Sequence, residues 1–119
     1  MSKDLCLSLG ELAPQTMTRT RGREAADALR NRATAAGASR VYLDMHAGSL
    51  VTASFVDELV RQAAQMDREG LQVVFVVAGA ETLEKFLKSV TWRGLSCRYR
   101  LADDPTVRIL RPAKTPDAS

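Results

Sequence analysis

The stretch that most constrains the fold runs from residue 41 to residue 69 and reads VYLDMHAGSLVTASFVDELVRQAAQMDRE. It opens with a β-prone apolar run that ends at Asp44, passes through a polar turn, and then takes up the period of a helix. Ser54 precedes Asp57 by one helical turn, which predicts a capping box that starts the helix at Ser54. The apolar stripe of this helix is expected to comprise Phe55, Val56, Leu59, Val60, Ala63 and Met66. A strand followed by an amphipathic helix is typical of α/β domains.

The other side of the same helix is polar and is predicted to face solvent. It carries Asp57, Glu58, Arg61 and Arg68. The two carboxylates also suit the positive end of the helix dipole, so a purely structural interpretation of both acids exists.

The chain before this stretch predicts one strand and one helix. Residues 5–9 alternate as a short strand, residues 10–17 form a loop, and a helix begins near Thr18 or Thr20 and ends at Gly37. The buried side of this helix is made of small residues, and Gly22 near its start indicates a close approach to another element.

The chain after it predicts the remaining elements. Residues 71–77 form an unbroken apolar run, which is typical of an innermost strand covered on both faces. A third helix follows and ends at Trp92 and Gly94, and residues 96–101 and 106–110 predict a hairpin at the sheet edge. We therefore predict an α/β fold with a mixed central sheet of about four or five strands and about three helices. The domain is expected to span residues 1–111, followed by a disordered tail over residues 112–119.

Length and composition restrict the class of protein. A chain of 119 residues with 45% hydrophobic content is sufficient for one compact domain with a core. No apolar segment reaches the roughly 20 residues that cross a bilayer, and the N-terminus lacks the pattern of a secretory signal. Cys6 and Cys97 are expected to be reduced thiols, which favours a cytoplasmic protein. His46 is the one histidine, so neither a metal site nor a cofactor is expected.

The net charge of +3 is unevenly distributed along the chain. Residues 18–40 and 88–119 are rich in basic residues, whereas residues 41–87 are acidic. This predicts an acidic side near the Asp57 helix and a basic side formed by the first helix and the C-terminal strands. One hypothesis is therefore a nucleic-acid-associated accessory protein that binds through its arginines. The candidates are Arg19, Arg21, Arg23, Arg30, Arg98, Arg100, Arg108 and Arg111.

Three segments carry a resemblance to a known family: TRGREAADAL, VYLDMHAGSLVTASFVDEL and GLQVVFVV. Together they resemble the STAS-like domain family of bacteria, relatives of the STAS domain of anti-sigma-factor antagonists and sulfate transporters. The most specific part is SFVDEL, at residues 54–59. The resemblance covers residues 18–78 and implies a single STAS-like domain that acts in signal transduction as a non-enzymatic regulatory protein.

The resemblance also implies a partner and a site. The partner would be a regulatory protein such as a histidine-kinase-like ATPase of the anti-sigma type, and membrane binding is not implied. In STAS antagonists a serine or threonine before the second helix is phosphorylated; the aligned position here is Ala53, which leaves Ser54 and Thr52 as candidate phosphosites. The predicted partner-binding residues are His46, Ser49, Thr52, Ser54, Asp57, Glu58 and Arg61.

Two other interpretations of the polar residues remain open. His46 with Asp44 would provide a general base, although no nucleophile or oxyanion motif accompanies them, so an enzyme is not expected. Asp44 at a strand end also resembles the site of a phosphoacceptor receiver domain. Such a domain needs acidic residues after the first strand and a lysine after a late strand, for which Glu11 and Lys88 are poor matches.

Overall fold

The computed structural model describes residues 3–13, 18–46 and 51–113 and shows an α/β domain with a mixed five-stranded sheet. The elements in chain order are β1 (Asp4–Ser8), α1 (Leu9–Leu12), α2 (Arg19–Ala36), β2 (Arg40–Asp44), α3 (Ala53–Arg68), β3 (Gln72–Val77), α4 (Ala80–Arg93), β4 (Cys97–Leu101) and β5 (Arg108–Leu110). The predicted fold class is confirmed.

The strands follow one another across the sheet in the order β1-β2-β3-β4-β5. The first four are parallel, and β5 returns antiparallel to β4. The apolar strand β3 therefore lies at the centre, and the predicted C-terminal hairpin forms one edge.

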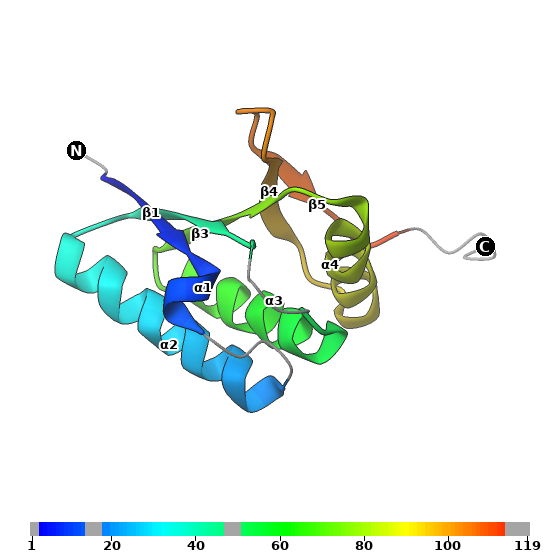
Figure 1. Cartoon of the computed structure of the whole chain (residues 1–119), viewed down its shortest axis with the longest axis horizontal. Coiled ribbons are helices and arrows are strands. Elements are labelled where there is room, and N and C mark those ends of the chain that lie inside the picture. The colour runs from blue at the N-terminus through cyan, green and yellow to red at the C-terminus, as the bar shows by residue number, and fades with distance from the viewer. Residues whose placement is uncertain (1–2, 14–17, 47–50, 114–119) are drawn as a thin grey trace.

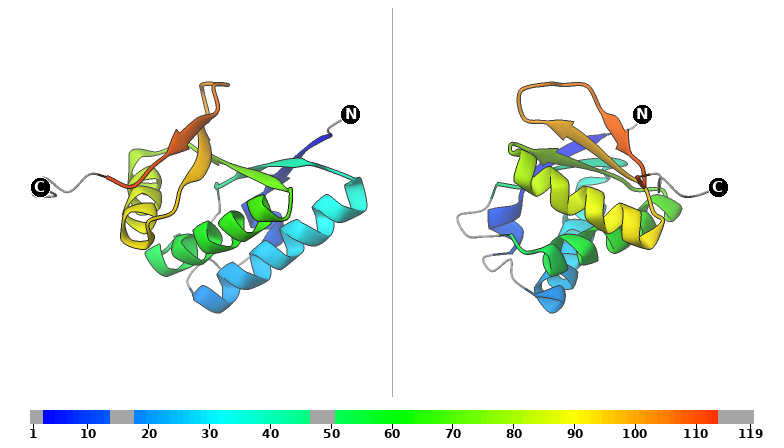
Figure 2. Two further views of the ribbon diagram at one scale, coloured as in Figure 1. Left: turned by 180° about the vertical axis from the view of Figure 1, so that it is seen from behind. Right: turned by 90° about the vertical axis from the view of Figure 1, so that its right-hand side faces the viewer.

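The helices α2, α3 and α4 lie on the same side of the sheet (Figures 1 and 2). This follows from the strand order, because right-handed connections between successive neighbouring parallel strands place each helix on the same side. The helix α3 lies between α2 and α4, and it contacts both. The helices therefore cover one face of β3, yet the strand is buried on both faces, as its unbroken apolar run predicts.

The hydrophobic core fills the space between the sheet and the helices. It is built from strand residues such as Val41, Leu43 and Phe75 and from helix residues such as Leu29 and Phe86. The predicted apolar stripe of α3 lies entirely within it: Phe55, Val56, Leu59, Val60, Ala63 and Met66. The predicted burial of this apolar stripe is thus confirmed.

On the opposite face of the sheet, Val74 and Val76 are also buried, although none of the described helices covers them. Val74 pairs in register with Tyr42 and Arg98, and Val76 pairs with Arg100. Arg100 also places its guanidinium 5.8 Å from the centre of the Tyr42 ring. Long side chains from neighbouring strands are therefore the groups that shield this face of β3.

Several element ends differ from the sequence prediction. The residues after β1 form the short helix α1 where a loop was expected, and Leu9 is buried there. The helices α2 and α4 do end at glycines in the left-handed conformation, Gly37 and Gly94, which have φ of 65°. The predicted disordered tail lies mostly outside the described residues, since 114–119 are not described.

Candidate functional site

The helix α3 begins at Ala53, and its N-cap is Thr52. The Thr52 hydroxyl accepts a hydrogen bond from the backbone N–H of Phe55 at 3.3 Å. The prediction that Ser54 caps the helix is therefore wrong. The side chain of Ser54 is exposed on the first turn, and the cap position falls two residues earlier in the chain.

Asp57 and Glu58 are buried, which contradicts their predicted place on a solvent-facing side of the helix. The residues are only 5% and 0% exposed, respectively. The physical reason is the central position of α3: the sheet covers one side of it, and α2 and α4 cover two others. A helix enclosed in this way buries positions that would face solvent on a helix at the edge of the layer.

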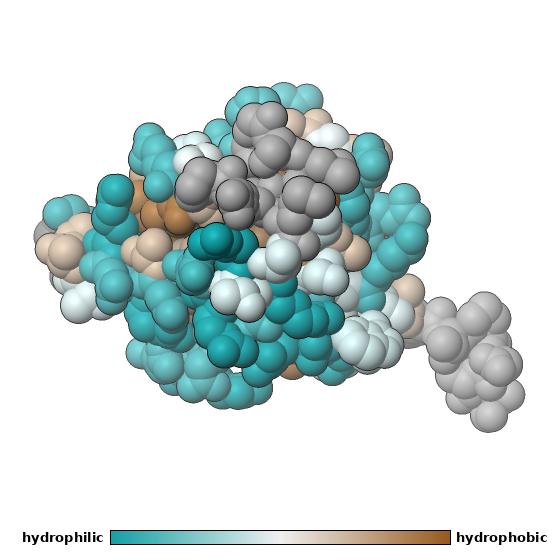
Figure 3. Space-filling model, turned by 60° about the horizontal axis from the view of Figure 1, so that its bottom comes forward, coloured by the Kyte–Doolittle hydropathy of each residue, from teal (hydrophilic) through white to brown (hydrophobic). Residues whose placement is uncertain are grey.

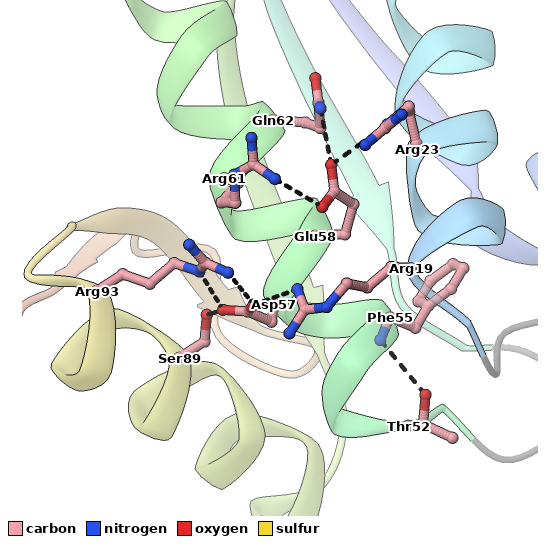
Figure 4. Close-up of polar contacts among 10 residues, drawn as sticks. All are labelled: Arg19, Arg23, Thr52, Phe55, Asp57, Glu58, Arg61, Gln62, Ser89 and Arg93. Atoms are coloured by element: carbon pink, nitrogen blue, oxygen red, sulfur yellow. Dashed lines mark hydrogen bonds and ion pairs between the residues drawn. The ribbon is translucent and has the colours of Figure 1, made fainter.

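Asp57 lies at the meeting point of three helices (Figure 4). From α4, Arg93 donates to both carboxylate oxygens at 2.6 Å, and Ser89 donates to Oδ1 at 2.7 Å. From α2, Arg19 donates through Nη1 to Oδ2 at 2.5 Å. The carboxylate thus links α2, α3 and α4 through charged hydrogen bonds in a desolvated position.

Glu58 forms a second cluster one residue further along α3 (Figure 4). Arg61 donates to Oε1 at 3.1 Å, and Gln62 donates to Oε2 at 2.8 Å. Arg23 of α2 approaches Oε2 at 3.9 Å. Each buried carboxylate therefore faces two guanidinium groups, so the charge of the two acids is more than compensated.

Gly22 lies between Arg19 and Arg23 on α2 and allows this close packing. A Cβ atom built at Gly22 would lie 3.0 Å from Glu58 Cβ and 3.0 Å from the backbone oxygen of Phe55. The glycine therefore lets α2 approach α3 closely enough for the flanking arginines to reach the two acids. The predicted close approach at this residue is confirmed.

The surroundings of Asp57 lower the pKa of its carboxyl group. Burial by itself raises the pKa of Asp57, but the hydrogen bonds donated by Arg93, Arg19 and Ser89 and the charge of Arg93 outweigh it. The pKa of this carboxyl group is consequently held well below its usual value, and the group is ionised at neutral pH.

A pocket of about 280 Å³ opens beside Asp57, between the first turn of α3 and one side of α4. Its lining residues are Arg19, Ala53, Ser54, Asp57, Lys85, Lys88, Ser89 and Trp92. The four residues from α4 recur at helical spacing and form one stripe. Trp92 is 73% exposed, which is unusual for so large an apolar side chain.

The predicted partner-binding residues are only partly brought together. Ser54 and Asp57 line the pocket, Thr52 caps the adjoining helix end, and Arg61 holds Glu58. His46 is exposed after β2, and its backbone N–H donates to Asp44 at 2.9 Å. Ser49 lies outside the described residues.

Within the described part of the chain, several arginines of the predicted basic side pair with acids, so the predicted acidic and basic sides are partly mixed. Arg19 and Arg23 pair with the acids of α3, Arg98 pairs with Asp67 at 2.8 Å, and Arg108 pairs with Asp104 at 3.0 Å. Arg21 and Arg30 pair with acids as well. Figure 3 shows that the visible part of the helical side is largely hydrophilic.

Sequence reasoning missed the contribution of α4 to this site. Ser89, Arg93 and Trp92 lie more than 30 residues beyond Asp57 in the chain, at separations of 32 residues for Ser89 and 36 for Arg93. The sequence did contain a pattern for the residues that α2 contributes to the site, since Arg19, Gly22 and Arg23 recur on one side of a helix. No comparable local signal marks Ser89 and Arg93.

Within the described ranges, no group of three or more histidine, cysteine, aspartate or glutamate side chains is placed to hold a metal ion. None of the described helices combines the length and the apolar character needed to span a membrane. The chain matches no protein-family model, and it has no significant match among curated proteins or solved structures.

Proposed function

We propose that this chain is a non-enzymatic regulatory domain that binds another protein, and that the binding surface is centred on the pocket between α3 and α4. The observation that carries the proposal is the exposure of Trp92 at the edge of that pocket. Tryptophan and arginine are the residue types that most often dominate the energetics of protein interfaces. An exposed tryptophan beside a concave site is therefore a suitable anchor for a partner.

The proposed binding surface includes only some of the partner-binding residues that the sequence predicts. Ser54 is exposed on it, whereas Asp57 and Glu58 lie beneath it and act by holding arginines in place. Lys85, Lys88 and Trp92 from α4 take the place of the two acids as contact residues.

The kind of partner follows from the resemblance to the STAS-like family. That resemblance favours a regulatory protein, such as a histidine-kinase-like ATPase of the anti-sigma type. Ser54 and Thr52 remain the candidate phosphosites of such a system. Ser54 is the better placed of the two, because its side chain is exposed while the Thr52 hydroxyl accepts the capping hydrogen bond.

The test is affinity purification of the tagged protein from its native cell, followed by mass spectrometry, with wild type, Trp92→Ala and Ile109→Ala compared. Ile109 is the matched control, since it is also a large exposed apolar residue, 50% exposed, but belongs to β5. We expect a regulatory ATPase to be recovered with wild type and Ile109→Ala and to be lost with Trp92→Ala. All three proteins should retain the same thermal melting transition.

Equal recovery of the partner by wild type and Trp92→Ala would show that the surface is wrongly chosen. Recovery only of proteins that disappear after nuclease treatment would favour the nucleic-acid hypothesis. In that case binding to DNA or RNA should fall steeply with added salt, because phosphate contacts release counterions. The internal pairing of Arg19, Arg23, Arg98 and Arg108 leaves less free positive charge for that mode than the sequence suggests.

A further inference from the structure

The pocket beside Asp57 has a cationic rim of a defined composition. Arg19 comes from α2, and Lys85 and Lys88 come from α4. The exposed Ser54 and the indole of Trp92 complete the rim. The site therefore combines positive groups with a flat apolar wall.

The acid at the floor of the pocket does not cancel this positive character. Asp57 is already paired with Arg93 at 2.6 Å on both oxygens and with Arg19. A carboxylate held by two guanidinium groups leaves the surroundings positive, and it also fixes Arg19 at the rim. An incoming anion would thus meet a preorganised cation rather than an unpaired acid.

Each lysine of the rim pairs with a glutamate of its own helix. Lys85 lies 3.8 Å from Glu81, and Lys88 lies 3.5 Å from Glu84, each one turn away on the same helix. The glutamates are strongly exposed, with side chains 83% and 63% accessible, so these pairs are largely screened by solvent. The side chain of Lys88 is 76% exposed and that of Lys85 is 22% exposed, so Lys88 is the freer of the two to turn toward an anion in the pocket.

The pocket is small. It measures about 280 Å³, at the lower end of the range of about 300–1,000 Å³ for pockets that bury a drug-sized ligand. This space is sufficient for one side chain with its flanking backbone. The indole of Trp92 offers contact area for the aliphatic part of such a side chain.

We propose that this pocket receives an aspartate or glutamate side chain from an acidic segment of the partner protein, with its carboxylate near Arg19, Lys85 and Lys88 and its methylene groups against Trp92. The inference rests on the proposed function and specifies the chemistry of the partner. The observations that carry it are the three basic residues that line the pocket and the exposed Trp92 beside them.

Trp92 makes the test direct, because it is the one tryptophan in the chain and it lines this pocket. The full-length protein is titrated with a hexaglutamate peptide at low salt, and the change in Trp92 emission gives the affinity. The variant Lys85→Gln/Lys88→Gln removes two rim charges. The matched control Arg32→Gln/Arg68→Gln removes two exposed positive charges from α2 and α3 that do not line the pocket.

We expect saturable binding to wild type that is weakened about tenfold or more by the lysine substitutions, stays within about twofold in the control, and declines with added salt. A third variant, Ser54→Glu, places a carboxylate of the protein itself at the rim of the pocket, and this carboxylate should compete with the peptide. Equal affinity of the lysine variant and the control would overturn the inference. So would a response to a phosphoserine peptide, to inorganic phosphate or to a homopolymeric RNA without a response to hexaglutamate.

The two proposals fail in distinguishable ways. If Trp92→Ala abolishes capture of the partner while Lys85→Gln/Lys88→Gln leaves it unchanged, the binding surface stands and the acidic occupant is wrong. If hexaglutamate binds at the pocket but Trp92→Ala leaves partner capture unchanged, the pocket binds acids and the proposed protein-binding surface is wrong.

Discussion

At the scale of single residues, Asp57 has the largest structural role among the polar side chains of the site. It accepts hydrogen bonds from Arg19, Ser89 and Arg93, which belong to two other helices. A buried carboxylate with these partners is stable, but it becomes costly when its partners or its charge are removed. Charge reversal at Asp57 would therefore disturb the fold itself, so it cannot serve as a test of partner binding.

Replacing Asp57 with asparagine should lower the free energy of unfolding by about 3 kcal/mol, because two guanidinium groups lose a charged partner in a desolvated position. Asp67→Asn is the matched control. Asp67 also pairs with an arginine, but its side chain is 48% exposed, and its loss should cost less than about 1 kcal/mol. Urea denaturation of both variants measures the difference. Similar losses in the two variants would contradict the structural role assigned to Asp57.

The lowered pKa of Asp57 predicts a specific acid sensitivity. The pKa of an aspartate in the unfolded chain is about 4. A carboxyl group whose pKa is lower in the folded protein contributes its full stabilisation at pH values above that unfolded-state pKa. That contribution is lost as the pH falls below this value. The free energy of unfolding should therefore drop more steeply between about pH 5 and pH 2 in wild type than in Asp57→Asn. Parallel pH profiles for the two proteins would show that Asp57 is not held in its charged form.

The two candidate caps of α3 give a second test at this scale. Thr52→Ala removes the hydroxyl that accepts from the Phe55 N–H and should cost about 1 kcal/mol of stability. Ser54→Ala changes an exposed residue within the first turn and should be close to neutral. Thermal melts of the two variants decide between the caps, and the reverse order of stability would restore Ser54 as the N-cap.

At the scale of elements, the contact between α2 and α3 depends on Gly22. Alanine there would place a methyl group 3.0 Å from both Glu58 Cβ and the Phe55 carbonyl oxygen, so the helices must move apart. We expect Gly22→Ala to destabilise the protein by about 1–3 kcal/mol, despite the better helix propensity of alanine.

Gly10→Ala is the control for this substitution, because a Cβ atom at Gly10 approaches only Ser8 Oγ, at 3.9 Å. Chemical denaturation of both variants measures the effect. A stabilising Gly22→Ala substitution would mean that the helix pair is more loosely packed than the structure indicates.

The elements themselves were largely predictable from local patterns. The stop of α2 at Gly37, the centre of the sheet at β3 and the hairpin of β4 and β5 all follow from short stretches of sequence. The short helix α1 and the cap at Thr52 were not predicted. Both depend on the exact residue at which a helix begins, and neighbouring polar residues give similar local signals for that position.

At the scale of the whole molecule, the helices cover one face of the sheet, and Cys97 lies at the covered face among the core residues. Burial raises the pKa of the Cys97 thiol to about 12, so little reactive thiolate forms in the folded protein. Cys6 is exposed on β1. One thiol therefore lies at the surface of the protein and the other in its interior, so their reactivities should differ.

We expect a thiol-specific reagent at pH 8 to modify Cys6 rapidly and Cys97 only after denaturant is added. Mass spectrometry of the labelled peptides identifies the modified residue, and Cys6→Ser is the control that leaves Cys97 as the one remaining thiol. Modification of Cys97 in the native protein at the rate of Cys6 would contradict the closed core.

The sequence by itself determined the order of the strands and of the three long helices, the apolar stripe of α3 and the need for a small residue at Gly22. These features depend on residue type and on periodicity within one segment. Only the tertiary structure decided that Asp57 and Glu58 are buried and paired with arginines. Their burial depends on how many neighbours surround α3, and their charge is balanced by arginines from α2 and α4. The pocket with Trp92 was decided in the same way, since its two walls come from helices that meet only when the chain has folded around the sheet.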